Sequence, residues 1–213
     1  MRAVIFDLDG TLLDSRPGIR AGLRHTLIRL GHQPPPDLDP DWAVGPPLEE
    51  VMARLLAPYG DGRVAEAVAH YRAWYVAEGL YDAQVYPGVP ELLGGLAAAG
   101  RPLFVATAKL VTFARLALDH FGLAGHFRAV YGAEPGVLSA PKVELIGTIL
   151  TAEGLDPARA AVVGDRALDI AAARAHGALA VGAAYGYGGR AELEAAGADR
   201  IGDSPAELAR LLA

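Results

Sequence analysis

The sequence predicts an α/β protein, with a doubly wound parallel sheet as a Rossmann-like core and an inserted all-helical domain. Short apolar runs alternate with helical patterns along most of the chain. These runs lack the polar alternation of strands with one solvated face, so they favour parallel strands that are covered on both faces. Only helical patterns occur between about residues 15 and 86, which predicts the insert.

Five apolar runs are the expected strands: "AVIF" (3–6), "PLFVAT" (102–107), "AAVVGD" (160–165), "ALAVGAA" (178–184) and the weaker "ADRIGD" (198–203). Helical patterns lie between them at 89–100, 111–122, 142–154 and 167–177. Three of these patterns close on a glycine that suits the residue after a helix, namely Gly100, Gly122 and Gly177. Strand and helix in alternation predict βαβ units.

The insert follows the first strand directly. Its helical patterns lie at 16–31, 47–60 and 62–79, and a proline-rich connector joins the first two at 32–42. The predicted domains are therefore a core formed by 1–14 and 87–213 and a helical domain formed by 15–86.

Composition excludes several classes of function. The 213 residues carry a net charge of −6, which argues against nucleic acid as the main partner. The sequence contains no run of 18 apolar residues, so no membrane span is expected. Charged residues occur too close to residue 1 for a secretory signal. Cysteine is absent, so thiol catalysis and cysteine-bound zinc are excluded. We expect a cytoplasmic protein, a monomer or homodimer, with a small-molecule partner.

Polar residues stand where the predicted strands end. Asp7 and Asp9 follow the first strand, Thr107 ends the second, and Asp165 with Asp169 follows the third. The carboxyl ends of parallel strands share one edge of the sheet, where ligands bind in open α/β folds. Carboxylates gathered there repel one another unless a cation lies between them, and oxygen ligands suit Mg²⁺. An ordinary acidic turn is the alternative for the first two.

Lysine is rare in this chain. Of 19 basic residues, only Lys109 and Lys142 are lysines. One interpretation is that two lysines occur by chance in an arginine-rich chain. The other is that a compact ammonium is needed at these positions because a guanidinium does not fit. Lys142 is the better candidate for a phosphate ligand, and Lys109 is expected to be structural or to face solvent.

Four motifs occur in order: "DLDGT" at 7–11, "VATAK" at 105–109, Lys142 in "PKVEL", and "GDRALD" at 164–169. With them the chain resembles the haloacid dehalogenase-type superfamily of phosphotransferases over essentially its whole length. "VGPPLEE" (44–50), "YRAWYVAEGLYDAQVYPGV" and "GYGGRAEL" are similar to the phosphoglycolate-phosphatase-like branch with a helical cap.

The resemblance implies a role for each matching residue. Asp7 would be the nucleophile that forms an aspartyl phosphate, and Asp9 the general acid and base. Thr107 and Lys142 would complete the catalytic set. Phosphate ligands would be Gly10, Thr107, Ala108 and Lys142. Metal ligands for Mg²⁺ would be Asp7, Asp9 (also through its backbone carbonyl), Asp165 and Asp169. Gly45, Pro46 and Pro47 of the cap would contribute to substrate specificity.

The implied function is a magnesium-dependent phosphatase, a hydrolase of a small phosphorylated metabolite such as phosphoglycolate. A 5′-nucleotidase, a pyrophosphatase, a sugar phosphomutase and a non-catalytic phosphate-binding protein stay open. Phosphomutases of this kind usually have valine where Thr11 stands, and a dehalogenase would lack Asp9 and the metal acids.

Local alternatives also stay open for single residues. Thr11 is expected to bond back to the loop of Asp9, and Thr107 could cap a helix that starts near Val111. Asp169 could face solvent, and Arg166 could pair with a surface carboxylate. "GYGG" (186–189) is expected to be a turn at the rim of the site.

Overall fold

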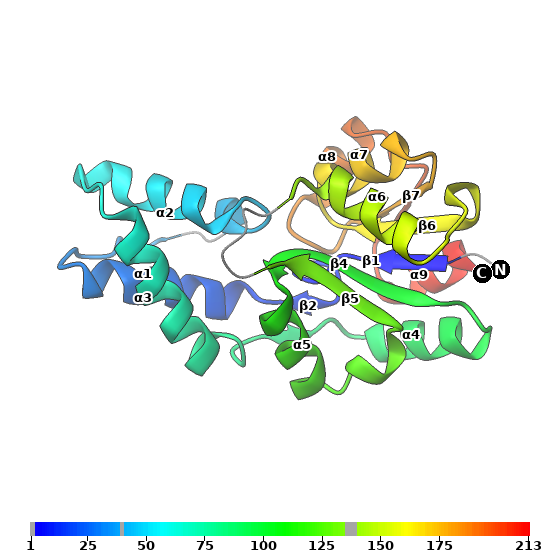
Figure 1. The fold of residues 1–213 in the computed structure, drawn as a ribbon, viewed down its shortest axis with the longest axis horizontal. Helices are drawn as coiled ribbons and strands as arrows, with labels where there is room; N and C mark the ends of the chain where they lie inside the picture. The colour runs from blue at the N-terminus through cyan, green and yellow to red at the C-terminus, as the bar shows by residue number, and fades with distance from the viewer. Residues whose placement is uncertain (1–2, 39–40, 135–139) are drawn as a thin grey trace. The chain divides into compact units, whose positions relative to one another are not determined.

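The computed structural model describes residues 3–38, 41–134 and 140–213 (Figure 1). Two compact units make up the chain, one formed by Met1–Asp14 with Val85–Ala213 and the other by Ser15–Gln84. We call them the core unit and the helical unit. The chain passes into the helical unit after the first strand and returns to the core unit at Val85, two residues before the return that the sequence predicted.

The core unit contains a six-stranded sheet in the order β5-β4-β1-β6-β7-β8. Its strands are β1 (Ala3–Phe6), β4 (Leu103–Leu110), β5 (Ala129–Ala133), β6 (Ala160–Gly164), β7 (Leu179–Ala183) and β8 (Arg200–Gly202). Every neighbouring pair is parallel, and Ile5 on β1 lies between Phe104 and Val162. The strand order reverses at β1, so the ligand-binding edge is expected beside the end of this strand.

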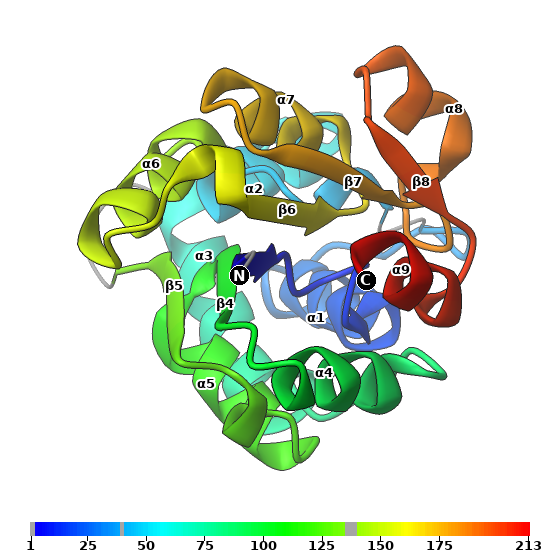
Figure 2. The ribbon, with the colours of Figure 1, turned by 90° about the vertical axis from the view of Figure 1, so that its right-hand side faces the viewer.

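Helices cover both faces of this sheet (Figure 2). One layer contains α6 (Lys142–Ala152), α7 (Ala167–Ala175) and α8 (Gly189–Ala195), and the other contains α4 (Val89–Ala98), α5 (Val111–His120) and α9 (Pro205–Leu212). The predicted doubly wound α/β core is confirmed. The glycines expected after α4, α5 and α7 have φ values of 69°, 70° and 72°, so they end their helices in the left-handed region.

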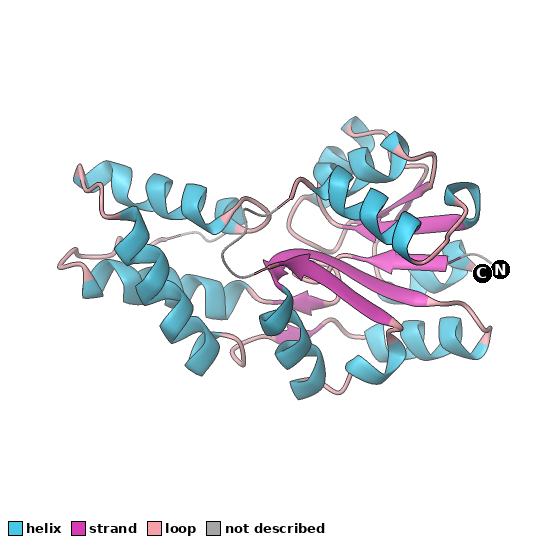
Figure 3. Ribbon diagram, viewed as in Figure 1, coloured by secondary structure: helices cyan, strands magenta, loops and turns pink. Residues whose placement is uncertain are grey.

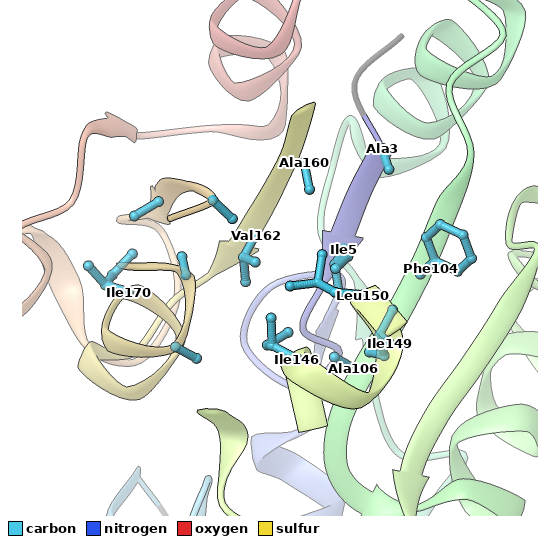
Figure 4. Close-up of a cluster of buried hydrophobic side chains, with 14 of the residues drawn as sticks. Ala3, Ile5, Phe104, Ala106, Ile146, Ile149, Leu150, Ala160, Val162 and Ile170 are labelled. Carbon is cyan, nitrogen blue, oxygen red and sulfur yellow. The ribbon is translucent and has the colours of Figure 1, made fainter. Parts of the chain in front are cut away.

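One buried hydrophobic cluster lies between the sheet and the layer of α6. Figure 4 shows Ile146, Ile149 and Leu150 of α6 facing Ile5 on β1 and Val162 on β6. All five side chains are buried. Because the first residue of α6 is Lys142, this packing also fixes the position of the lysine backbone, from which its side chain extends toward the sheet edge.

The helical unit contains α1 (Arg16–Arg29), α2 (Leu48–Leu56) and α3 (Val64–Trp74), followed by a π-helical turn (Tyr75–Gly79) (Figure 3). Short 3₁₀ turns occur at Asp41–Ala43 and Ala57–Tyr59. Its core includes Leu23, Leu27, Met52 and Leu56, all fully buried. The predicted helical insert is confirmed, although the patterns at 47–60 and 62–79 each end in a 3₁₀ or π turn.

Several elements were not expected from the sequence. Strand β5 was missed because its residues are only half-buried, so "AVYGA" lacks a strong apolar run. Helices α8 and α9 were missed because each has eight residues or fewer. A separate two-stranded sheet pairs β2 (Leu13–Asp14) with β3 (Gln84–Val85), strands too short to leave a pattern. No described helix is long and apolar enough to cross a membrane.

Candidate functional site

The loop after β1 carries the two acids of "DLDGT". Asp7 follows the strand directly, and its N–H donates to the carbonyl of Val163 on β6 (2.8 Å). Leu8 between the acids is fully buried, and its carbonyl accepts hydrogen bonds from the loop residues that follow. The burial of Leu8 anchors the loop, so both carboxyls stand at the carboxyl end of the central strand.

Lys142 reaches Asp7 from the first turn of α6. Its Nζ lies 2.7 Å from Asp7 Oδ1, 2.9 Å from Asp169 Oδ1 and 2.9 Å from the carbonyl oxygen of Ala106. The lysine side chain is 7% exposed. One ammonium therefore joins acids from two different strand ends to β4, as a compact cation with several donors can.

Asp165 and Asp169 follow β6 and are almost completely buried. Asp165 accepts from the Thr11 hydroxyl (Oδ1, 3.1 Å) and from the N–H of Tyr187 (Oδ2, 2.8 Å). Asp169 accepts from the N–H of Arg166 through Oδ2 (3.2 Å), which caps α7. The solvent-facing alternative for Asp169 is therefore wrong.

The acids of the site form one cluster. Asp7, Asp165 and Asp169 each offer a carboxylate oxygen, and these oxygens lie within 4.8 Å of one another. With Lys142, the four side chains carry three negative charges and one positive charge, a formal sum of −2 that a divalent cation would balance. All the donors are carboxylate oxygens, and Asp165 and Asp169 are buried. This donor set fits Mg²⁺.

Burial and mutual repulsion disturb the protonation of these acids. Burial raises the pKa of Asp7 from its ordinary value of 3.8 to about 7, against the lowering effect of Lys142. Burial also raises the pKa of Asp165 well above its usual range, and the charges of Asp7 and Asp169 raise it further. Burial alone would lower the pKa of Lys142, but Asp169 and Asp7 hold it above its ordinary value. The cluster is thus short of positive charge.

Gly10 gives the loop its close approach to Asp165. It has a φ of 93°, and a Cβ there would lie 2.3 Å from Asp165 Oδ2. Its N–H donates to the Leu13 carbonyl (2.8 Å), so the role of Gly10 as a phosphate ligand stays a prediction. Gly186 closes the other side, where a Cβ would lie 2.3 Å from Asp165 Cβ. Glycines surround Asp165 because its carboxyl leaves no room for a side chain.

Gly10→Ala is expected to lower the free energy of unfolding by about 2–3 kcal/mol, because it adds a clash with Asp165 to the strain of a positive φ. Gly122→Ala is the matched control, since Gly122 also has a positive φ (70°) but open space where the Cβ would be. It should cost only about 1 kcal/mol. Urea unfolding of both variants measures the difference; equal losses would contradict the close approach.

The structure brings a second lysine to the site. Lys109 Nζ lies 2.7 Å from Asp9 Oδ1, and the two side chains are 9% and 12% exposed. Of the two expectations for Lys109, the one that it faces solvent is wrong. The Asp9 carboxylate is not part of the three-acid cluster. Its predicted contact with a metal through the backbone carbonyl stays a prediction.

Thr107 is buried near the end of β4, and its hydroxyl accepts from the N–H of Lys109 (3.1 Å). It does not cap α5, where Leu110 is the capping residue and no side chain makes the capping bond. The roles of Thr107 and Ala108 as phosphate ligands stay predictions. The Thr11 N–H bonds back to the Leu8 carbonyl in the loop that carries Asp9 (3.3 Å), as expected, whereas its hydroxyl donates to Asp165.

The "GYGG" turn contributes more than a rim. The Tyr187 N–H of the turn donates to Asp165, and the hydroxyl of Tyr185, the residue just before the turn, donates to the Thr11 carbonyl (2.8 Å). The sequence carried no signal for these bonds, because they join residues more than twenty positions apart. Arg166 pairs with Glu192 (Nε to Oε1, 3.0 Å), as the surface-carboxylate alternative expected.

The predicted specificity residues Gly45, Pro46 and Pro47 lie in the helical unit, immediately before α2. Gly45 has a φ of 103°, and Pro47 is the residue that caps α2. Their contact with substrate stays a prediction. Three arginines of this unit have partners inside it: Arg54 lies over the Trp42 ring (4.5 Å), Arg63 pairs with Asp61, and Arg72 pairs with Glu49.

Comparison with known proteins agrees with this geometry. Residues 4–183 match the family model described as haloacid dehalogenase-like hydrolase. A 5′-nucleotidase of Pseudomonas aeruginosa is 39% identical over 192 residues, which cover 90% of this chain and 86% of that protein. A phosphoglycolate phosphatase of Rhodospirillum rubrum is 37% identical over 87% of this chain and 80% of its own length.

Solved structures share the fold. A haloacid dehalogenase-like hydrolase from Streptococcus pneumoniae has a TM-score of 0.90 at 31% identity, covering 100% of this chain and 99% of its own. Mycobacterium tuberculosis protein tyrosine kinase A has a TM-score of 0.79 at 37% identity, covering 99% and 97%. With its strand-end acids and these likenesses, the chain belongs to the haloacid dehalogenase-like hydrolase family, as a phosphatase of the phosphoglycolate-phosphatase-like branch.

Proposed function

We propose that this phosphatase is Mg²⁺-dependent and hydrolyses a small phosphomonoester through an aspartyl phosphate on Asp7. The observation that carries the proposal is the placement of the Asp7 carboxylate. It lies 2.7 Å from the Lys142 ammonium and within the cluster formed with Asp165 and Asp169. A carboxylate in this position can attack phosphorus only where positive charge masks the phosphate.

Asp7 and Asp9 divide the chemistry between them. An oxygen of Asp7 forms a bond to phosphorus while the bond to the leaving oxygen breaks, and Asp9 gives that oxygen a proton. Water then attacks the phosphorus of the acyl phosphate, giving up a proton to Asp9 and releasing Asp7 and inorganic phosphate. Lys142 holds Asp7 in place and neutralises phosphoryl charge.

Mg²⁺ would be held by Asp7, Asp165 and Asp169, with the Asp9 carbonyl as a further predicted ligand. When bound, it supplies positive charge that polarises the phosphoryl group. Thr11 and the N–H of Tyr187 orient Asp165 for this role, since both donate to its carboxylate.

Phosphoglycolate is the proposed substrate, supported by the branch to which the chain belongs. A 5′-nucleotide is the second candidate, supported by the nucleotidase relative that is 39% identical. Both are phosphomonoesters, so one assay distinguishes them.

The test is phosphate release in the presence of Mg²⁺ from phosphoglycolate, 5′-nucleoside monophosphates, hexose phosphates and pyrophosphate, with Asp7→Asn as the background. The highest kcat/KM is expected for phosphoglycolate. A preference for nucleotides would move the assignment to the second candidate. Release no greater than that of Asp7→Asn with every compound would contradict the proposal.

A further inference from the structure

The only two lysines of the chain are both in the site. Lys142 pairs with Asp7 and Lys109 pairs with Asp9, each at 2.7 Å from Nζ to Oδ1. The remaining 17 basic residues are arginines. A chain that uses arginine almost everywhere keeps the compact ammonium at the two places where an acid of "DLDGT" needs a cation in a confined space.

The backbone around Lys109 is shaped to aim this side chain. The register of β4 against β5 shifts between Ala106 and Leu110, and Lys109 lies inside this irregular stretch. A break in the register, as at a β-bulge, redirects a side chain from its expected face. Strand β5 makes room with Gly132, where a Cβ would lie 2.6 Å from the Lys109 carbonyl oxygen.

The contact between Lys109 and Asp9 is well protected. Both side chains are nearly buried, and the hydrogen bond from the Lys109 N–H to Thr107 Oγ1 holds the base of the lysine (3.1 Å). An ammonium on Oδ1 restricts the rotation of the carboxyl group of Asp9. A general acid must be held within hydrogen-bond reach of the atom that receives its proton.

We propose that Lys109 is a positioning residue, which holds the carboxyl of Asp9 in the orientation for proton transfer to the leaving oxygen of the substrate. This inference rests on the proposed function. In the step concerned, the electron pair of the breaking P–O bond goes to the leaving oxygen. The proton moves from Asp9 to that oxygen, and Asp9 keeps the electron pair of its O–H bond.

The test compares two phosphate monoesters of similar size, one of a phenol and one of an alcohol. p-Nitrophenyl phosphate has a leaving group that departs without a proton, whereas benzyl phosphate has one that requires it. Lys109→Met should lower kcat for benzyl phosphate by about 10²-fold but for p-nitrophenyl phosphate by less than about 3-fold. Arg190→Met is the control, since Arg190 is an exposed member of an ion pair with Asp203 in the same unit; it should change neither rate.

Two further variants show whether the effect passes through Asp9. In the Asp9→Asn background, Lys109→Met should cause no further loss with benzyl phosphate, because residues that act as a unit are not additive. Gly132→Ala displaces the irregular stretch of β4 while leaving both charged groups intact, and it should give the same selective loss with benzyl phosphate.

Equal losses with both esters would overturn the inference, because a merely structural role affects every substrate alike. A raised KM with unchanged kcat would also overturn it, since Lys109 would then bind substrate. In either case an active wild type would leave the proposed function standing. An inactive wild type, with no release above the Asp7→Asn background, would instead contradict the proposed function itself.

Discussion

Asp7→Asn is expected to lower phosphate release by at least about 10³-fold, because the amide cannot attack phosphorus to form the acyl phosphate. The change is nearly isosteric, so the fold should persist. Measurement of kcat/KM with Mg²⁺ checks the loss. Asp203→Asn is the matched control, since Asp203 is an exposed acid in the same unit and its replacement should leave the rate unchanged.

The same variant should be more stable than the wild type at pH 8 without Mg²⁺. The pKa of Asp7 is raised by burial from 3.8 to about 7, so the folded state binds this proton more tightly than the unfolded state. The stability from the protonated form is full below about pH 4 and is lost as the pH rises through 7. Asp7→Asn should avoid a loss of about 4 kcal/mol at pH 8. A variant that is less stable than the wild type there would contradict the charge imbalance.

Lys142→Met is expected to damage both folding and activity. Asp7 and Asp169 would lose the ammonium that lies within 2.9 Å of each, and buried carboxylates would face one another. Removing one partner of a buried ion pair costs about 3–5 kcal/mol. Phosphate release should also fall by about 10³-fold, because the Lys142 ammonium no longer neutralises the negative charge on the phosphoryl oxygens. Urea unfolding and kcat/KM measure the two effects.

A second substitution separates charge from packing in this variant. Lys142→Met with Asp7→Asn should be more stable than Lys142→Met alone, since one of the repelling carboxylates is gone. Arg190→Met should change the free energy of unfolding by less than about 0.5 kcal/mol, as expected for an exposed pair. No recovery in the double variant would show that packing, not charge, causes the loss.

The sequence predicted the sheet and most helices because their signals are local. Buried parallel strands such as "AVIF" show as apolar runs, and glycines after helices mark where they end. Strand β5 has half-buried residues at one edge of the sheet, so its apolar signal is weak. The three-residue strand β8 was still predicted, because "ADRIGD" stands where the alternation of strand and helix expects one.

The site was harder to predict, because its contacts join distant parts of the chain. The motifs placed Asp7, Asp165 and Lys142 correctly at one edge. No local pattern shows that the Thr11 hydroxyl turns to Asp165, or that Lys109, in an irregular stretch of β4, pairs with Asp9. The scarcity of lysine and the motif "VATAK" pointed to Lys109, but neither signal says what the residue contacts.

Calorimetric titration of Mg²⁺ into the metal-free protein and into Asp165→Asn tests the central claim most directly. The claim is that the acids after β1 and β6 together hold one divalent cation. We expect one Mg²⁺ per wild-type chain at pH 8, with proton release that grows as the pH falls toward 7, because Asp7 then carries a proton that the metal displaces. Asp165→Asn should bind at least about 10-fold more weakly. Equal affinity in the two proteins, or no binding by the wild type, would contradict the claim.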